Sequence, residues 1–362
     1  MLVIKNGKIV TMTGRLIDGG DILIENSVIR DLTDESSYVP TLSDTVIDAK
    51  GFFVFPGFID MHTHCGLDGT ASGDAYRNEL LITPYMKTSM FINPDSTDFT
   101  DRLSSGITST LVAPFDSRIV GGKCCMVKTY SHDGKLNIVS DDCGIQFSLA
   151  GMSDENYSVY PDSIPAFIKD DLRCAREYLS PNNKSDNVLD SPSFSAYGSI
   201  LSCDKPAFFN VTDEHQFNIA EKIAKSFSLN AVMVLDMKDT AGLLGLYDMP
   251  FIIDPSKVGN LTLKNLAGEI SSNNAEFAIS ASSHDFLPVN TGLFVRAGLD
   301  MEKGFEAITT NPAAICGLSN KIGSLQSGLD ADIVLWNDNP LEIMAKVVCS
   351  VVGGHIAYSE LS

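Results

Sequence analysis

Short apolar runs alternate with amphipathic stretches through the middle of this 362-residue chain, and this alternation constrains its fold more than any other feature. The apolar runs have the length of buried β-strands, and the stretches between them have the apolar spacing of helices. Strand and helix alternating over about 260 residues favour a (β/α)8 barrel, with a doubly wound parallel sheet as the alternative. The expected strands are 55–63, 109–114, 145–150, 207–211, 231–235, 251–253 and 277–281, and the expected helices are 163–178, 215–228, 240–247 and 301–309.

Both ends of the chain are built differently, from short strand-like segments joined by tight turns. Asn6-Gly7 is a strong hairpin signal between residues 2–4 and 9–12, and Gly353-Gly354 separates two further strand-like segments, 347–352 and 355–358. Because an isolated hairpin is only marginally stable, we expect both ends to form one small β-sandwich. The expected domains are a sandwich made of 1–54 and 321–362 and a barrel made of 55–320, with a surface loop at 180–195.

Composition excludes several classes of function. The chain has 26 basic and 46 acidic side chains, a net charge of −20, which disfavours nucleic-acid binding. No apolar run approaches the roughly 20 residues that a membrane span needs, so no membrane association is expected. The eight cysteines form no C-x-x-C pair and no secretory leader is evident, so we expect reduced thiols in a cytoplasmic protein.

The segment that carries the clearest chemistry reads Phe55-Pro-Gly-Phe-Ile-Asp-Met-His-Thr-His-Cys-Gly. Side chains alternate along a strand, so Asp60, His62 and His64 are expected on one face. Two imidazoles about 6.5–7 Å apart at their Cα atoms can share a divalent ion at the mouth of a barrel. Asp60, one position deeper, would then orient the histidines. We expect Cys65 to pack rather than to react.

With this segment, the chain resembles the amidohydrolase superfamily, in its branch related to imidazolonepropionase. Five blocks in order carry the resemblance: 55–66, 105–110, 121–129, 306–318 and 322–336. The resemblance implies a barrel and a divalent metal, usually zinc, that activates water for attack on an amide or similar carbon–nitrogen bond. It also implies an aspartate at the end of the eighth strand that takes the proton of this water.

Several positions at which the family has metal ligands or its general base carry other residues here. The histidines of the fifth and sixth strands correspond to Asn210 and Asp236, and the catalytic aspartate of the eighth strand corresponds to Ser283. A Glu-Asn pair near the fourth strand matches 155–156 only after a small insertion. Because a catalytic zinc site typically has three protein ligands and a water, two histidines alone would bind a metal weakly.

Three interpretations follow, and we favour the first. In it, the site is rebuilt around one divalent metal, with zinc the first choice, bound weakly or lost. Its metal ligands would be His62, His64 and Asp236, its catalytic residues His284, Asp285 and Asp236, and its substrate-binding residues Asn210, Ser283 and Lys128. The chain would then hydrolyse a non-peptide carbon–nitrogen bond in a small cyclic amide or acylated amino compound.

In the second interpretation the chain is a catalytically inactive amidohydrolase homologue that binds a small molecule or a protein partner. In the third it is a scaffold whose barrel mouth holds no ligand. Relatives often self-associate, so a homo-oligomer is compatible with the resemblance. The loop with Gly121-Gly-Lys123 lacks the spacing of a P-loop, and its match to a family loop makes Lys123 or Lys128 a candidate to line the pocket. The remaining histidines, His132, His215 and His355, are expected outside it.

Overall fold

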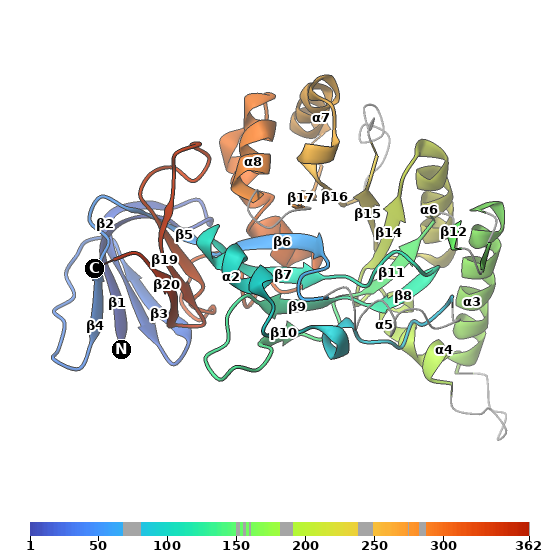
Figure 1. Cartoon of the computed structure of the whole chain (residues 1–362), viewed down its shortest axis with the longest axis horizontal. Helices are drawn as coiled ribbons and strands as arrows, with labels where there is room; N and C mark the ends of the chain where they lie inside the picture. Colours follow the sequence, from blue (N-terminus) through green and yellow to red (C-terminus); the bar gives the residue numbers. More distant parts are fainter. Residues whose placement is uncertain are drawn as a thin grey trace.

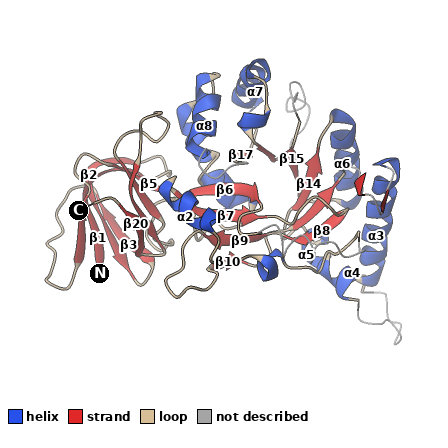
Figure 2. Ribbon diagram, viewed as in Figure 1, coloured by secondary structure: helices blue, strands red, loops and turns tan. Residues whose placement is uncertain are grey.

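The computed structural model describes residues 1–67, 81–149, 153–154, 157–158, 161–181, 191–237, 249–273, 275–281 and 287–361. The protein is a mixed α/β fold in which a sheet from both chain ends lies beside a larger part of strands and helices (Figure 1). Figure 2 shows several helices around the strands of this larger part: α3 (Ile164–Tyr178), α6 (Glu214–Phe227), α7 (Asn260–Asn273) and α8 (Leu287–Arg296). No helix within the described ranges is long and apolar enough to cross a membrane.

Strands from both termini pair into one sheet, in the order β20-β19-β18-β5-β1-β2-β3 with β4 also paired to β1. Its strands are β1 (Leu2–Val10), β2 (Leu16–Glu25), β3 (Val28–Thr33), β4 (Thr45–Asp48), β5 (Phe53–Pro56), β18 (Ile333–Trp336), β19 (Val347–Val352) and β20 (His355–Ser359). The antiparallel pair of β5 and β18 joins the two ends, as expected, and the predicted Gly353-Gly354 hairpin connects β19 and β20. The two-layer sandwich stays a prediction.

The hairpin predicted at Asn6-Gly7 is wrong. Strand β1 passes straight through both residues, with a shift of its register against β2 on either side of Gly7. Asn6 has a φ of 60°, and its backbone N–H donates to the carboxylate of Asp21 at 3.2 Å. Asn-Gly supplies the left-handed backbone of a β-bulge as readily as that of a turn, so the local signal alone could not separate the two.

The larger part contains two further sheets. One has the order β10-β9-β7-β6 and the other the order β17-β16-β15-β14-β11-β8. The neighbours β6–β7 and the run from β11 through β17 pair in parallel, whereas β9 pairs antiparallel with β7 and β8 with β11. The strands are β6 (Phe58–Thr63), β7 (Ile107–Val112), β8 (Val120–Lys123), β9 (Cys125–Lys128), β10 (Ile138–Ser140), β11 (Ile145–Ser148), β14 (Ala207–Val211), β15 (Ala231–Leu235), β16 (Phe251–Ile253) and β17 (Phe277–Ile279).

These two sheets share one apolar core. Inward side chains from both sheets form a single buried cluster, while a second cluster lies between the strands and the surrounding helices. The inner cluster includes Ile59, Met61, Leu111, Phe208, Val232, Ile252 and Ala278. The described residues thus surround a common interior as a barrel does, although their strands form two sheets and not one closed ring.

The predicted strand bounds agree with the structure for three strands that are buried at every residue. Strands β14, β15 and β16 have the predicted bounds, and helices α3 and α6 begin within one residue of theirs. Run 55–63 is divided at Gly57, where a Cβ would lie 1.9 Å from Oγ1 of Thr108. The predicted helix 240–247 and most of the loop 180–195 lie outside the described residues.

The remaining described elements connect or cap those above. They are α2 (Thr97–Ser104), α4 (Pro192–Ala196), α5 (Gly198–Leu201), α9 (Met301–Glu306), α10 (Thr310–Ile315), the 3-10 turns Thr88–Phe91, Pro161–Ser163 and Pro255–Lys257, and the short strands β12 (Ser153–Asp154) and β13 (Tyr157–Ser158).

Candidate active site

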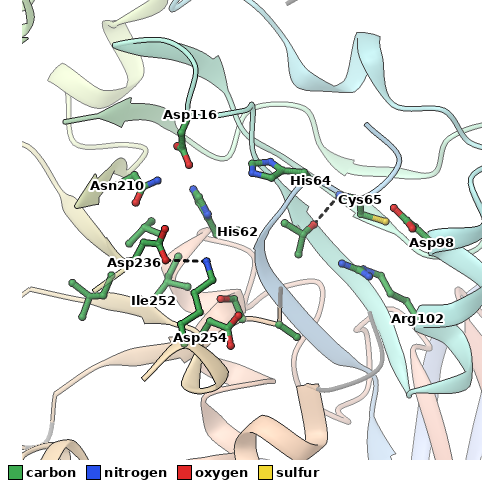
Figure 3. A pocket seen from close by; sticks show the side chains of 16 residues that line it. His62, His64, Cys65, Asp98, Arg102, Asp116, Asn210, Asp236, Ile252 and Asp254 are labelled. Carbon is green, nitrogen blue, oxygen red and sulfur yellow. Dashed lines mark hydrogen bonds and ion pairs between the residues drawn. The ribbon is translucent and has the colours of Figure 1, made fainter. Parts of the chain in front are cut away.

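A cavity of about 340 Å³ lies at the carboxyl ends of β6, β14, β15, β16 and β17. His62 and His64 stand on one side of it, with Asn210, Asp236 and Asp254 across from them (Figure 3). The carboxyl ends of parallel strands are where barrel enzymes place their reactive groups, because the loops there vary without disturbing the core. The cavity is therefore the candidate active site.

A break in the regular strand brings His62 into this cavity. The register of β6 against β7 shifts between Asp60 and Thr63, and His62 has a φ of 58°. A left-handed conformation is costly for a bulky side chain, and such strain is found most often at functional sites. The expected simple alternation of Asp60, His62 and His64 is wrong, because a bulge interrupts it.

The two imidazoles lie close together, with their ring centres 6.2 Å apart. Nδ1 of His64 lies 2.9 Å from the carbonyl oxygen of Ala113, which can only accept, so this nitrogen donates and Nε2 keeps its lone pair. The ring also packs against Phe115, with 4.6 Å between ring centres. His64 is thereby fixed in the tautomer that metal-binding histidines use.

His62 is held as a neutral ring. Burial lowers its pKa to about 4; the neighbouring His64 adds to this lowering, and the carboxylate of Asp116 opposes it. Its Nε2 is buried and has no hydrogen-bond partner within the described structure. A neutral imidazole with a free nitrogen is available to a ligand, a substrate or a metal ion.

Asp60 joins three elements next to the candidate active site. Its carboxylate accepts a hydrogen bond from the backbone N–H of Ala281 at 3.0 Å, just after β17. It also pairs with the guanidinium of Arg102 on α2 at 3.3 Å, and both side chains are buried. The pair thus holds β6, the helix α2 and the end of β17 together.

Asp236 does not join the histidines as a metal ligand. Its carboxylate accepts a hydrogen bond from Nζ of Lys257 at 2.9 Å, and both side chains are 45% exposed. Among the described residues, no three His, Cys, Asp or Glu side chains converge closely enough to hold a metal ion. The predicted triad of His62, His64 and Asp236 is therefore not formed.

The described residues supply only part of the divalent-metal site that the resemblance implies. The free Nε2 of His62 and the buried, unpartnered Oδ1 of Asn210 are groups that a metal could satisfy. An amide oxygen is a poor zinc ligand, however, and zinc enzymes typically bring three protein ligands. The described side chains do not complete a zinc site.

The other predicted site residues have different outcomes. Asn210 lines the cavity, and its role in substrate binding stays a prediction. Ser283, His284, Asp285 and the pair 155–156 lie outside the described residues.

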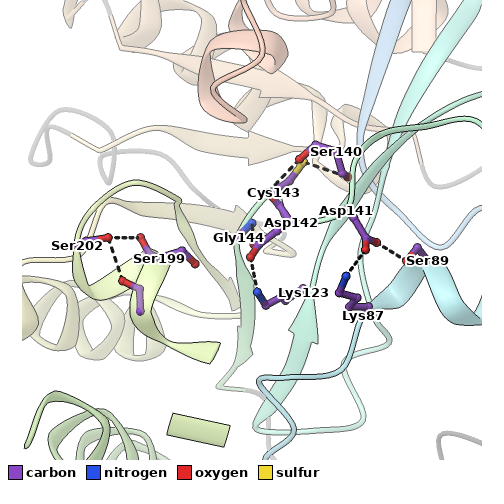
Figure 4. Close-up of polar contacts among 11 residues, drawn as sticks. Lys87, Ser89, Lys123, Ser140, Asp141, Asp142, Cys143, Gly144, Ser199 and Ser202 are labelled. Atoms are coloured by element: carbon purple, nitrogen blue, oxygen red, sulfur yellow. Dashed lines mark hydrogen bonds and ion pairs between the residues drawn. The ribbon is translucent and has the colours of Figure 1, made fainter. Parts of the chain in front are cut away.

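The two lysines expected at the pocket lie elsewhere. Lys128 is buried and binds Asp330 at 2.5 Å and Asp332 at 2.8 Å, beside a second cavity that His132 and His355 also line. Lys123 binds Asp142, next to the pair of Lys87 and Asp141 (Figure 4). Both lysines thus form ion pairs instead of lining the candidate active site. The fold places Asp330 and Asp332 beside Lys128, and Asp142 beside Lys123.

Asp116 also belongs to the candidate active site, although it is not among the site residues predicted from the sequence. It follows the carboxyl end of β7, lines the cavity, and points toward His62 (Figure 3). The amide of Gln146, a buried residue of the otherwise apolar β11, donates a hydrogen bond to its carboxylate. The polar Gln146 inside the apolar strand β11 is the sequence signal that indicated a buried polar partner such as Asp116.

Comparisons with known proteins agree on one family. The family model named Amidohydrolase family matches residues 280–358. An imidazolonepropionase from Picrophilus torridus is 40% identical over 80 residues, which cover 21% of this chain and 19% of that one. The amidohydrolase tasK of Hapsidospora irregularis is 22% identical over 94% of this chain and 40% of its own length. The chain thus spans well under two thirds of these curated relatives.

Solved structures show the fold over the whole chain. An amidohydrolase from Thermotoga maritima MSB8 superposes with a TM-score of 0.88 at 21% identity, covering 99% of this chain and 100% of that one. A β-aspartyl dipeptidase from Fervidobacterium islandicum AW-1 has a TM-score of 0.62 at 15% identity, covering 99% and 97%. Residues 280–358 thus match the amidohydrolase family model, and the whole chain has the fold of these solved amidohydrolase structures.

Proposed function

We propose that the chain is a hydrolase that cleaves a non-peptide carbon–nitrogen bond in a small cyclic amide or acylated amino compound. One observation carries this proposal: His62 and His64 enter the cavity as imidazoles that each keep a nitrogen free. The strain that brings His62 there is difficult to explain as packing alone. Several similar proteins have names that denote hydrolysis of such bonds, including D-phenylhydantoinase and imidazolonepropionase.

Within this proposal the described residues bind and orient the reacting group. Nε2 of His62 and the side chain of Asn210 lie where a substrate amide would meet its first contacts. Lys257, held by Asp236 at the rim, offers a movable positive charge. Asp254 is fixed by hydrogen bonds from Ser256 and Asn290, so its carboxylate shapes the wall of the cavity.

Hydrolysis of a panel of cyclic amides by protein purified without chelators tests the proposal. Ring opening of a hydantoin or dihydropyrimidine is followed at the absorbance of the ring. We expect His62→Ala to lower kcat/KM by about 100-fold or more, since it removes a group at the reacting centre. His215→Ala, on an exposed position of α6, is the matched control and should leave the rate unchanged. Turnover that survives in His62→Ala would contradict the proposal.

A second function, binding without catalysis, is favoured by one observation. No three ligand-type side chains converge in the part of the chain that the structure describes. Metal analysis after incubation with excess zinc, iron or manganese separates the two functions. Less than about a tenth of an equivalent of metal, with no turnover of the panel, would favour the binding protein, because catalytic zinc sites retain their ion through three ligands.

We also propose that the two sheets of the larger part belong to one (β/α)8 barrel covering 55–320, and that 1–54 and 321–362 form a β-sandwich. The common interior cluster supports the barrel. A further support is the hydrogen bond from the backbone N–H of Ile59 on β6 to the carbonyl of Ile308, because Ala307 in turn accepts from Ile279 of β17.

A further inference from the structure

The candidate active site is rich in negative charge. Its walls carry the carboxylates of Asp98, Asp116, Asp236 and Asp254 against two cationic side chains, Arg102 and Lys257. Both cations already bind a carboxylate, since Arg102 pairs with Asp60 and Lys257 with Asp236. The chain as a whole has a net charge of −20, so its field also attracts cations.

Asp116 is the carboxylate with the least compensation. It stands beside His62 and receives a hydrogen bond from the amide of Gln146, which is neutral. No cationic side chain within the described ranges pairs with it. Gln146 is 1% exposed, so its amide holds the carboxylate in one orientation without neutralising its charge.

Asn210 independently indicates a ligand with N–H groups. Its side chain is 4% exposed, lies next to Asp116 and His62 in Figure 3, and lines the same cavity. Its Oδ1 is buried and has no hydrogen-bond partner in the described structure. Buried acceptors are nearly always satisfied in folded proteins, so an unsatisfied one in a cavity indicates a missing donor.

We propose that this cavity takes an organic cation with N–H donors, of the amidinium or guanidinium class, bound by Asp116 and Asn210 beside His62. A planar amidinium can place two N–H groups on the oxygens of one carboxylate, which is among the strongest polar contacts in proteins. The inference rests on the proposed function, whose substrate class it narrows. A divalent metal fits less well, because no three ligand-type side chains converge among the described residues.

Three probes of nearly the same shape test the charge requirement on the intact chain. Benzamidinium, benzamide and benzoate are planar and differ mainly in being cationic, neutral and anionic at neutral pH. We expect isothermal titration calorimetry to show benzamidinium binding at least about 10-fold more tightly than benzamide, with no binding of benzoate. Equal affinity for benzamidinium and benzamide would overturn the proposal, and this comparison needs no variant protein.

Asp116→Asn tests the position. It keeps the shape of the side chain and removes the charge, so benzamidinium should lose at least about 10-fold in affinity and benzamide almost none. Asp133→Asn, at the second cavity, is the matched control and should change neither. Unchanged benzamidinium binding by Asp116→Asn would overturn the assignment. So would a metal site at Asp116: one equivalent of zinc would then displace benzamidinium from the wild type but would not displace it from Asp116→Asn.

Binding of these probes does not require turnover. Selective benzamidinium binding by a chain that hydrolyses nothing would refute the hydrolase and keep the cation site. Hydrolysis of neutral amides without selective benzamidinium binding would refute the cation site and keep the hydrolase.

Discussion

At the scale of single residues, the candidate site depends on one unusual backbone conformation. Sequence alternation alone would point His62 to the same side as Asp60, which the structure shows bound to Arg102 on α2. The bulge at His62 turns its ring toward the cavity, while Ile59 and Met61 stay in the inner core. The local sequence Met61-His62-Thr63 does not predict this bulge, because histidine does not adopt a positive φ as readily as glycine does.

The ion pair of Asp60 and Arg102 gives a prediction at this scale. The two side chains are 0% and 4% exposed, so removing one charge leaves the other buried without its partner. We expect Asp60→Asn to lower the free energy of unfolding by about 3–5 kcal/mol, although Asn can still accept from Ala281. Urea unfolding measures the change.

The double variant Asp60→Asn, Arg102→Met is the control for this pair. It removes both charges, and its stability should recover much of the loss. Losses that simply add in the double variant would show that the two side chains do not interact.

At the scale of elements, helix α6 shows how a sequence defines its own boundaries. Asp213 accepts a hydrogen bond from the backbone N–H of Gln216 at 2.8 Å, and Oε1 of Gln216 accepts one from the N–H of Thr212 at 2.9 Å. The first bond satisfies an N–H group that a helix start leaves open, and the second ties the residue before the cap to the first turn. Its other end is Ser228, with a φ of 52°, where the helix stops. Such local signals explain why α6 was predictable.

The N-terminal cap of α6 gives the second stability prediction. Asp213→Ala removes the acceptor, and we expect it to lower the free energy of unfolding by about 1 kcal/mol. Asp213→Asn keeps an acceptor of the same reach and should change stability little. Thermal or urea unfolding of both variants checks this; an equal loss in both would show that the charge and not the cap is what matters.

At the scale of the whole molecule, a buried lysine joins the terminal sheet to the larger part. Lys128 lies on β9, and its partners Asp330 and Asp332 immediately precede β18. Burial opposes the charge of this lysine, but the two carboxylates raise its pKa overall, so it stays charged. Oδ1 of Asp332 also accepts the backbone N–H of Gly353 at 2.8 Å, which ties the last hairpin to the same cluster.

Lys128→Met therefore should destabilise the contact between these two parts. It leaves Asp332, which is buried, without a positive partner, and we expect a loss of about 3–5 kcal/mol in the free energy of unfolding. The variant Lys128→Met, Asp332→Asn should lose less, because no buried charge stays uncompensated. Hydrolysis or probe binding at the His62 cavity should stay unchanged in any fraction that folds, since Lys128 lines the other cavity.

The sequence by itself predicted the resemblance to amidohydrolases, the strands β14, β15 and β16, the helices α3 and α6, and the position of the histidine pair at a strand end. These follow from local information, because apolar runs such as β14–β16 are buried on both faces and caps such as Asp213 act within one turn. Only the tertiary structure decided which polar groups meet. Lys128 binds Asp330 more than two hundred positions away, Asp236 binds Lys257 and not the histidine pair, and Asp116 acts on His62 from the turn after β7. Such pairings depend on how the chain closes on itself, because charges and hydrogen bonds act over a few ångströms in space and carry no mark in the sequence.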